Sequence, residues 1–295
     1  MGKPVVGNHN RRQYPFIESK TLINMDPAPL KSYKNRYPFR LATTSFIYPD
    51  HIIPNVKILG QYLDEIELIL FESSPASLPS KPEIKTLFNL AKALDLTYNI
   101  HLPLDISLGD NSLAKRNQGV DTIKRIIDLA APLIASTHTL HLAYNESSKA
   151  KTSVAKWQKN VYKSMEQLLS FGINGKTISI ETLLYPFEWV ENIITALNLS
   201  VCMDIGHLIL QNTDLETFFG KYSEATSIIH LHGVKNLRDH VSLVNLPEKE
   251  IVPVLKILKR FAGVVSLEVF GHNNLIASLR FLETCWEGIS KRKKG

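Results

Sequence analysis

The chain has 295 residues, of which 44% are hydrophobic and 21% charged, and its formal net charge is +6. This composition excludes a collagen, a coiled coil and a chain that is disordered throughout. Two cysteines, Cys202 and Cys285, are too few for a disulfide scaffold and indicate a reducing compartment. No apolar run reaches the roughly 18–20 residues that span a bilayer, and the N-terminus lacks the apolar core of a secretory signal, so we expect a cytoplasmic protein without a transmembrane segment.

The excess positive charge lies near the two ends of the chain. Residues 1–40 contain eight Lys/Arg and two Asp/Glu, residues 291–295 contain four Lys/Arg and no acid, and the residues between them carry a net charge of −4. A protein that binds nucleic acid needs a basic face, so this distribution argues against nucleic acid as a partner. We interpret residues 1–37, which contain four prolines, as a basic extended arm, and residues 291–295 as a basic tail.

From residue 38 onward, short runs rich in Ile, Val, Leu and Thr alternate with segments of helical periodicity. Most of these runs are apolar on both faces, which is typical of parallel strands that are covered on both sides. The predicted strands are 39–45, 65–71, 96–102, 137–143, 176–182, 199–205, 226–232 and 263–270.

The segments between these strands place apolar residues at helical spacing. In residues 81–94, for example, Pro82 lies in the first turn, where proline is tolerated. The predicted helices are 54–62, 81–94, 119–135, 153–171, 186–197, 248–260 and 273–289. Eight strands, each followed by a helical or mixed segment, predict a single (β/α)8 TIM barrel of the α/β class over residues 38–290, with the N-terminal arm as an extension; an open doubly wound sheet is the alternative.

Ionisable side chains recur where the predicted strands end, which is where the catalytic residues of such barrels lie. Burying this many charged groups without a cation would cost several kcal/mol each, so the pattern predicts a metal site. Imidazole mixed with carboxylate, without thiolate, favours Zn, Mn, Fe or Co over Ca or Mg. The candidates are Glu72, His101, His141, Glu181, Asp204, His207, His230, His232, His240 and Glu268.

Two other residues near these strands are given different roles. Cys202 is two positions before Asp204 and therefore on the same face of a flat strand, but we assign it to core packing. His138 begins its strand, so we expect it at the opposite end of the barrel.

Four of these residues, on the last four predicted strands, resemble the metal quartet of the xylose-isomerase-like barrels: Glu181, Asp204, His230 and Glu268. That superfamily includes sugar isomerases, sugar epimerases and apurinic-site endonucleases. The endonuclease branch adds three histidines, which His101, His141 and His207 match. Its Asp-x-His pair is matched only by His240, because Arg238 stands where the Asp is expected; Asp239 would need a shifted register to serve in a third metal site.

Within this superfamily the chain is most similar to the cobamide-remodelling phosphodiesterases. The phrases that carry this resemblance are RLATTSFIYPDHIIPNV, DEIELILFES, YNIHLPLD, ISIETLLYPFEW, CMDIGHLIL, HLHGV, DHVSL and SLEVF, over about residues 38–270. The resemblance implies hydrolysis of the nucleotide loop of a vitamin B12-like corrinoid, which would be the small-molecule partner. The sequence does not indicate an oligomeric state.

For such a hydrolase we expect two divalent ions, with Zn favoured over Mn, Fe or Co. Glu181 would bridge the ions, His101 and His141 would complete one site, and Asp204, His230 and Glu268 the other. His207 and His240 would hold a third ion, or bind phosphate and transfer protons. The expected catalytic residues are Glu181, Glu268, His207 and His240.

Substrate contacts are expected from residues near the same strand ends. Lys235 and Arg238 would contact phosphate, or belong to a solvated loop. Tyr185 would form an apolar wall for a flat ligand, or pack on the barrel. Glu72 would orient a ligand histidine, or begin a loop.

Three other functions remain open. A sugar isomerase or epimerase would use one metal ion and two carboxylates that move protons. An apurinic-site endonuclease would need a basic face for its polyanionic substrate. A catalytically inactive corrinoid-binding module is the alternative outside the enzymes.

Overall fold

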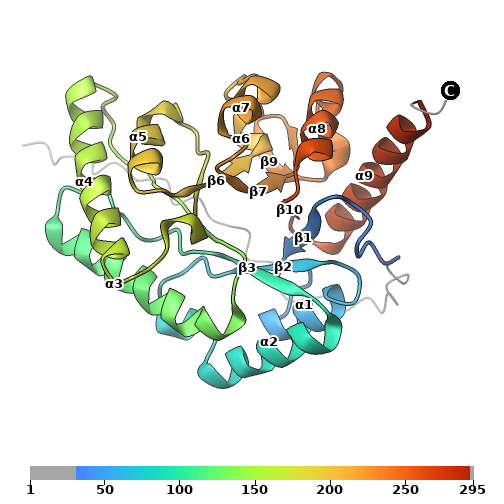
Figure 1. Cartoon of the computed structure of the whole chain (residues 1–295), viewed down its shortest axis with the longest axis horizontal. Helices are drawn as coiled ribbons and strands as arrows, with labels where there is room; N and C mark the ends of the chain where they lie inside the picture. Colours follow the sequence, from blue (N-terminus) through green and yellow to red (C-terminus); the bar gives the residue numbers. More distant parts are fainter. Residues whose placement is uncertain (1–30, 293–295) are drawn as a thin grey trace, which may run out of the picture. The chain divides into compact units, whose positions relative to one another are not determined.

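Eight parallel strands form a closed barrel in the order β1-β10-β7-β6-β5-β4-β3-β2 (Figure 1). The computed structural model describes residues 31–292. Each barrel strand lies within a run that was predicted to be a strand, so the (β/α)8 prediction is confirmed and the open doubly wound sheet is excluded. The barrel strands are β1 (Arg40–Thr44), β2 (Glu65–Ile69), β3 (Thr97–His101), β4 (His138–Leu140), β5 (Ile178–Glu181), β6 (Ser200–Asp204), β7 (Thr226–Leu231) and β10 (Val264–Leu267).

Helices pack around the outside of these strands (Figure 1). The bounds of α2 and α8 are as predicted, whereas α3 begins at Leu113 rather than at residue 119. The helices are α1 (Ile52–Leu59), α2 (Lys81–Leu94), α3 (Leu113–Ala130), α4 (Lys151–Leu169), α5 (Glu188–Ala196), α6 (Ile205–Leu210), α7 (Leu215–Tyr222), α8 (Glu248–Arg260) and α9 (His272–Arg292). Among the described residues, no helix is both long and apolar enough to cross a membrane.

Local signals explain why α2 has the predicted bounds. At its start, Ser80 and Glu83 form a capping box, in which the Ser80 backbone N–H donates to Glu83 Oε2 at 2.8 Å. This box satisfies N–H groups that have no partner within the helix. At its end, Asp95 adopts a left-handed conformation, which turns the chain out of the helix.

Apart from β7, the sequence did not predict the elements between β6 and α8. Helices α6 and α7 follow β6, and β8 (Gly233–Lys235) pairs with β9 (Arg238–Val241) as an antiparallel hairpin after β7. The hairpin turns through Asn236 and Leu237, which both have positive φ, as a type I′ turn requires. These elements have three to eight residues each, too few to show a clear periodicity.

The inside of the barrel contains charged and polar side chains as well as apolar ones. Ser266 Oγ on β10 donates to Glu67 Oε2 on β2 at 2.6 Å, and β1 lies between these two strands. Both side chains therefore face the interior. Glu65 also lies inside and accepts from Asn99 Nδ2 at 2.9 Å and from Ser136 Oγ at 2.5 Å. Hydrogen bonds offset the cost of burying these groups.

The first described residues contact the barrel. Tyr33 is buried, and its backbone N–H donates to the Tyr62 carbonyl at 2.8 Å. Lys31 and Arg36 form ion pairs with Glu283 of α9 at 2.7 and 2.5 Å. Residues 31–37 of the predicted arm thus lie against the barrel. Residues 1–30 of that arm, and residues 293–295 of the predicted tail, are outside the described residues.

Candidate metal centre

The six predicted ligands on the barrel strands lie at the carboxyl ends of those strands. Three of them are the last residues of β3, β5 and β6, and the others are within one residue of a strand end. Because the strands are parallel, these side chains meet at one end of the barrel. They are His101, His141, Glu181, Asp204, His230 and Glu268.

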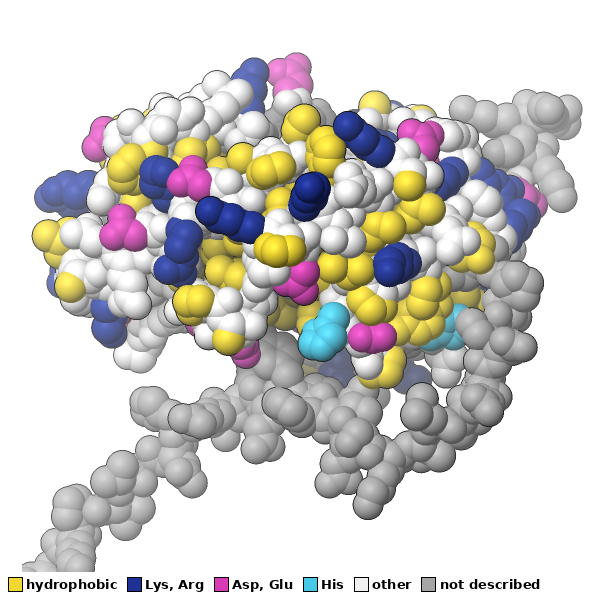
Figure 2. Space-filling model, turned by 90° about the horizontal axis from the view of Figure 1, so that it is seen from below, with side chains coloured by type: hydrophobic (Ala, Val, Ile, Leu, Met, Phe, Trp, Pro, Cys, Tyr) yellow, Lys and Arg dark blue, Asp and Glu magenta, His cyan; other side chains and the backbone are white. Residues whose placement is uncertain are grey.

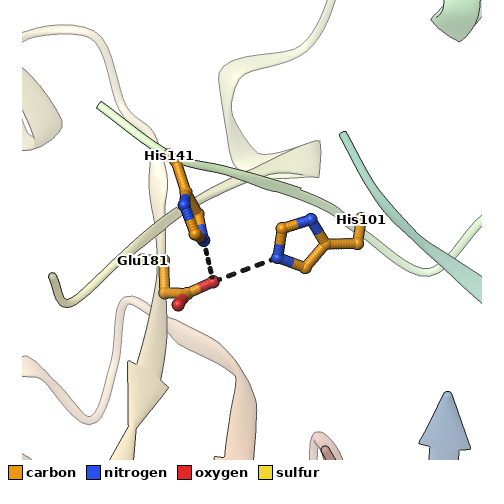
Figure 3. A group of neighbouring side chains, drawn as sticks. All are labelled: His101, His141 and Glu181. Atoms are coloured by element: carbon orange, nitrogen blue, oxygen red, sulfur yellow. Dashed lines mark hydrogen bonds and ion pairs between the residues drawn. The ribbon is translucent and has the colours of Figure 1, made fainter. Parts of the chain in front are cut away.

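The first cluster of possible ligands surrounds one oxygen of Glu181 (Figure 3). Glu181 Oε2 lies 2.8 Å from His141 Nε2 and 3.4 Å from His101 Nε2. His101 Nδ1 lies 3.0 Å from the carbonyl oxygen of Leu102, which can only accept, so Nδ1 carries the proton and Nε2 is free to bind a metal. Two imidazole nitrogens and a carboxylate oxygen therefore converge on one point, with all three atoms within 4.8 Å of one another.

A second cluster is centred on His230. Its Nδ1 atom lies 2.9 Å from Glu268 Oε2 and 3.5 Å from Glu181 Oε2. His230 Nδ1 and Glu268 Oε2 are buried, yet neither makes an aligned hydrogen bond. Buried polar atoms without a partner are costly. The arrangement therefore fits a divalent cation bound by His230, Glu268 and Glu181.

Asp204 lies beside these residues and is held from two sides. Its Oδ1 atom caps α6 by accepting from the backbone N–H of His207 at 2.7 Å. His232 Nε2 lies 3.1 Å from both carboxylate oxygens. The backbone N–H of His240 donates to His232 Nδ1 at 3.0 Å, so the proton of His232 is on Nε2 and points at Asp204. This fixes the direction in which Asp204 presents its remaining lone pairs.

The β8–β9 hairpin contributes to a third cluster. His207 Nδ1 lies 2.9 Å from the Thr182 carbonyl oxygen, which leaves His207 Nε2 facing Asp239 Oδ2 at 3.5 Å. Ligand atoms of His207, Asp239 and His240 lie within 4.8 Å of one another. Adjacent strand residues normally point to opposite sides, but His240 has a φ of 51°. This left-handed residue supplies the register shift that Asp239 needs.

Burial and mutual charge together set the protonation of these groups. Burial lowers the pKa of His207, but Asp204, Asp239 and Glu181 raise it, to a net value of about 10. Burial raises the pKa of Glu181, but His141 and His101 lower it to well below its usual range. The carboxylates are therefore ionised at neutral pH, as metal ligands must be.

Cys202 is close to the same centre and also belongs to the packed core of the barrel. Its sulfur lies within 4.8 Å of ligand atoms of Glu181 and His230. Burial raises the pKa of the thiol, so a cation would have to displace its proton in order to bind. Cys202 also packs in a buried layer with Ala42, Ile228 and Val264. The remaining nitrogen and oxygen donors suit Zn, Mn, Fe or Co.

The predicted substrate-binding residues differ in their surroundings. Lys235 and Arg238 are exposed, on either side of the hairpin turn. Tyr185 is buried: it stacks on Trp189 with ring centroids 5.6 Å apart, and its hydroxyl donates to the Leu142 carbonyl at 2.9 Å. Packing accounts for these contacts of Tyr185.

The predictions from sequence missed the roles of two buried residues. Glu67 lies inside the barrel, 3.0 Å from His230 Nε2, and His232 holds Asp204. Glu72, expected either to orient a ligand histidine or to begin a loop, is exposed in the loop after β2 and accepts from Ser77 Oγ at 2.7 Å. The alternation of Glu and Ile/Leu in β2 is the signal that could have identified Glu67, because every second residue of a strand faces the barrel interior.

Solved structures with the same fold include epimerases and an endonuclease. A D-tagatose 3-epimerase-like protein matches with a TM-score of 0.71 and 19% identity, over 86% of this chain and 99% of that one. The 3-keto-D-glucoside 4-epimerase of E. coli matches with a TM-score of 0.64 and 15% identity, over 84% and 100%. Endonuclease IV of Thermus thermophilus matches with a TM-score of 0.66 and 16% identity, over 84% and 99%.

The sequence itself also matches a family of known proteins. No curated protein matches the chain closely enough to be counted as a relative. A family described as the xylose isomerase-like TIM barrel matches residues 58–285, which is most of the chain and contains every residue of the three clusters. The protein therefore belongs to the xylose isomerase-like TIM barrel family.

Proposed function

We propose that this protein is a metal-dependent phosphodiesterase. The observation that carries the proposal is the position of His101 and His141, which converge on Glu181 in addition to the cluster around His230. A site for a single ion would need only four residues, namely Glu181, Asp204, His230 and Glu268. The two extra imidazoles support a centre for at least two ions, as is common in enzymes that cleave phosphoric esters.

In this proposal the candidate metal ligands form three groups. His101 and His141 would hold one ion together with Glu181, and Asp204, His230 and Glu268 would hold the other, with Glu181 close enough to serve both. When bound, such ions neutralise charge on phosphorus and lower the pKa of water. The third cluster, His207, Asp239 and His240, binds a further ion or holds the phosphate and moves a proton at His207 Nε2. Zn is the first candidate for the ions.

We further propose that the substrate is a cobamide, whose nucleotide loop contains the phosphodiester. The support is the sequence resemblance over about residues 38–270 to cobamide-remodelling phosphodiesterases. Lys235 and Arg238 are exposed at the end of the hairpin that carries Asp239 and His240 of the third cluster, so they can contact a phosphate.

A sugar epimerase or isomerase is the second candidate. The similar folds of the D-tagatose 3-epimerase-like protein and the E. coli epimerase support it. So do Glu181 and Glu268, two buried carboxylates that both approach His230 Nδ1 and could move protons to and from a sugar. This reaction uses one ion and gives His101 and His141 no part as a pair.

An apurinic-site endonuclease is supported by the similar fold of endonuclease IV. The charge of the chain weighs against it, because residues 41–290 carry 26 Asp/Glu and 22 Lys/Arg. On the face drawn in Figure 2, acidic and basic side chains are interspersed rather than gathered into a basic patch. A duplex binds best to a continuous basic face.

The experiment that tests the proposal counts metal ions and compares three substrates. Purified protein is loaded with Zn, its metal content is measured, and it is then given a cobamide, an abasic duplex or ketohexoses, with Glu181→Gln as the inactive control. We expect at least two ions per chain and release of a base-free corrinoid. One ion per chain with epimerised sugar would establish the second candidate, and incision of the duplex would establish the endonuclease.

A further inference from the structure

Strand β2 places two carboxylates inside the barrel, below the metal centre. Glu65 and Glu67 are both fully buried. They lie two residues apart on one strand and therefore face the same side. A buried carboxylate is costly unless other groups bind it, so the contacts of each one indicate what it does.

Hydrogen bonds within the barrel stabilise the buried carboxylate of Glu65. Its oxygens accept from Thr97 Oγ1 at 2.6 Å, from Asn99 Nδ2 at 2.9 Å and from Ser136 Oγ at 2.5 Å. Arg40 Nε lies 3.3 Å away. None of these residues belongs to the three clusters of possible metal ligands. Glu65 therefore ties neighbouring strands together at the amino end of the barrel.

Glu67 has a different partner. One oxygen accepts from Ser266 Oγ at 2.6 Å, and the other lies 3.0 Å from His230 Nε2. The opposite nitrogen of the same ring, Nδ1, is the one that faces Glu268 and Glu181. His230 is thus a fully buried ring with the metal centre on one side and a carboxylate, itself anchored by Ser266, on the other.

We propose that Glu67 is a positioning residue for the metal centre, acting through His230; this inference rests on the centre proposed above. A histidine that binds a metal through one nitrogen commonly donates the N–H of the other to a carboxylate, which fixes the tautomer and makes the ligand more basic. In the present orientation the Nε2–Glu67 contact lacks the angle of a hydrogen bond. His230 Nε2 and Glu67 Oε1 are nevertheless 3.0 Å apart, and both are buried without another hydrogen-bond partner.

Glu67→Gln tests this inference, and Glu65→Gln is its matched control. Both variants replace a fully buried carboxylate of β2 by a neutral group of the same size. Zn affinity is measured for each by competition with a chromogenic chelator, and folding is checked by circular dichroism. We expect Glu67→Gln to bind Zn about 10–100-fold more weakly, and Glu65→Gln to keep the wild-type affinity. Equal affinities of Glu67→Gln and wild type, or equal losses in both variants, would overturn the inference.

A measurement on the wild-type protein makes the test independent of whether Glu67→Gln folds. In the Zn-loaded protein, nitrogen-15 NMR should show His230 bound through Nδ1 with a protonated, hydrogen-bonded Nε2. Binding through Nε2 would overturn the inference. These readouts need no substrate, so a protein that loses affinity as expected but cleaves no phosphodiester contradicts only the proposed function. A wild type that binds no divalent ion contradicts both.

Discussion

His232 Nε2 lies 3.1 Å from each carboxylate oxygen of Asp204 and, by its tautomer, donates to that carboxylate. Asp204 at the same time caps α6. One carboxylate therefore connects a helix start, a buried histidine and the metal centre. Gly206, in the first turn of α6, makes this arrangement possible, because a Cβ at that position would lie 2.0 Å from His232 Cε1.

Gly206→Ala should therefore disturb both stability and metal binding. The new methyl group overlaps the buried ring of His232 and forces it away from Asp204. We expect the free energy of unfolding to fall by about 1–3 kcal/mol and Zn affinity to fall with it. Urea unfolding of the metal-free protein and chelator competition measure the two effects.

Gly220→Ala is the control for this substitution. Gly220 lies within α7, and a Cβ there would have no neighbouring atom within 4 Å. Alanine favours the helix, so this variant should gain about 0.5–1 kcal/mol and bind Zn like the wild type. If Gly206→Ala also kept its free energy of unfolding and its Zn affinity, the contact between His232 and Asp204 would not be needed for either.

The second prediction concerns His141, the partly exposed member of the first cluster. His141→Ala removes one of the two imidazoles beside Glu181, while Asp204, His230 and Glu268 remain. We expect the bound metal to fall by one ion per chain and phosphodiester cleavage to fall at least about 100-fold. The exposed His51 provides the control, since His51→Ala should retain full metal content and activity. Unchanged stoichiometry in His141→Ala would remove the basis for a two-ion centre.

The sequence was sufficient to predict the barrel and the ionisable side chains that meet at its strand ends. Parallel strands that are covered on both sides read as apolar runs, so a His or Asp at the end of such a run is conspicuous. His101 and Asp204 were found in this way. Glu67 was missed because it lies in the middle of its strand rather than at the carboxyl end.

Other features depend on contacts that no local pattern contains. Asp239 joins the third cluster only because His240 is left-handed. Histidine adopts the left-handed conformation occasionally, and the neighbouring residues in the sequence do not indicate where it does so. The role of His232 similarly depends on the backbone N–H of His240, eight residues later. Tertiary geometry, rather than residue type, determines these assignments.

The third prediction concerns the pH dependence of the metal-free protein. Although burial lowers the pKa of His207, the surrounding carboxylates raise it from 6.5 in the unfolded chain to about 10. Because the folded pKa is the higher one, this stabilisation is fully present below pH 6.5 and is lost as the pH rises through about 10. The free energy of unfolding, measured in urea with a chelator present, should fall over that interval.

His207→Asn provides the control, because its side chain does not titrate while the backbone N–H that Asp204 accepts is retained. The fall should be smaller in this variant. Zn binding by the wild type should change in the opposite direction, since a cation competes with the proton for His207 Nε2 and binds more tightly as the pH rises. The same alkaline slope in the variant and the wild type would show that His207 is not the group responsible.

The last prediction concerns Leu237, at the turn of the β8–β9 hairpin. Its side chain is 87% exposed, so it gains little from burial, and its φ of 61° is strained for a residue with a Cβ. Leu237→Gly creates Asn-Gly, the preferred pair for a type I′ turn. Removing the strain should outweigh the entropy cost of glycine and raise the free energy of unfolding by about 0.5–1 kcal/mol. Leu184→Gly is the control, because Leu184 is exposed without a positive φ and should lose stability on the same change.

If the hairpin end contacts the substrate, as proposed for Lys235 and Arg238, Leu237→Gly should also raise KM while kcat is retained. A loss of kcat at unchanged KM would contradict that placement.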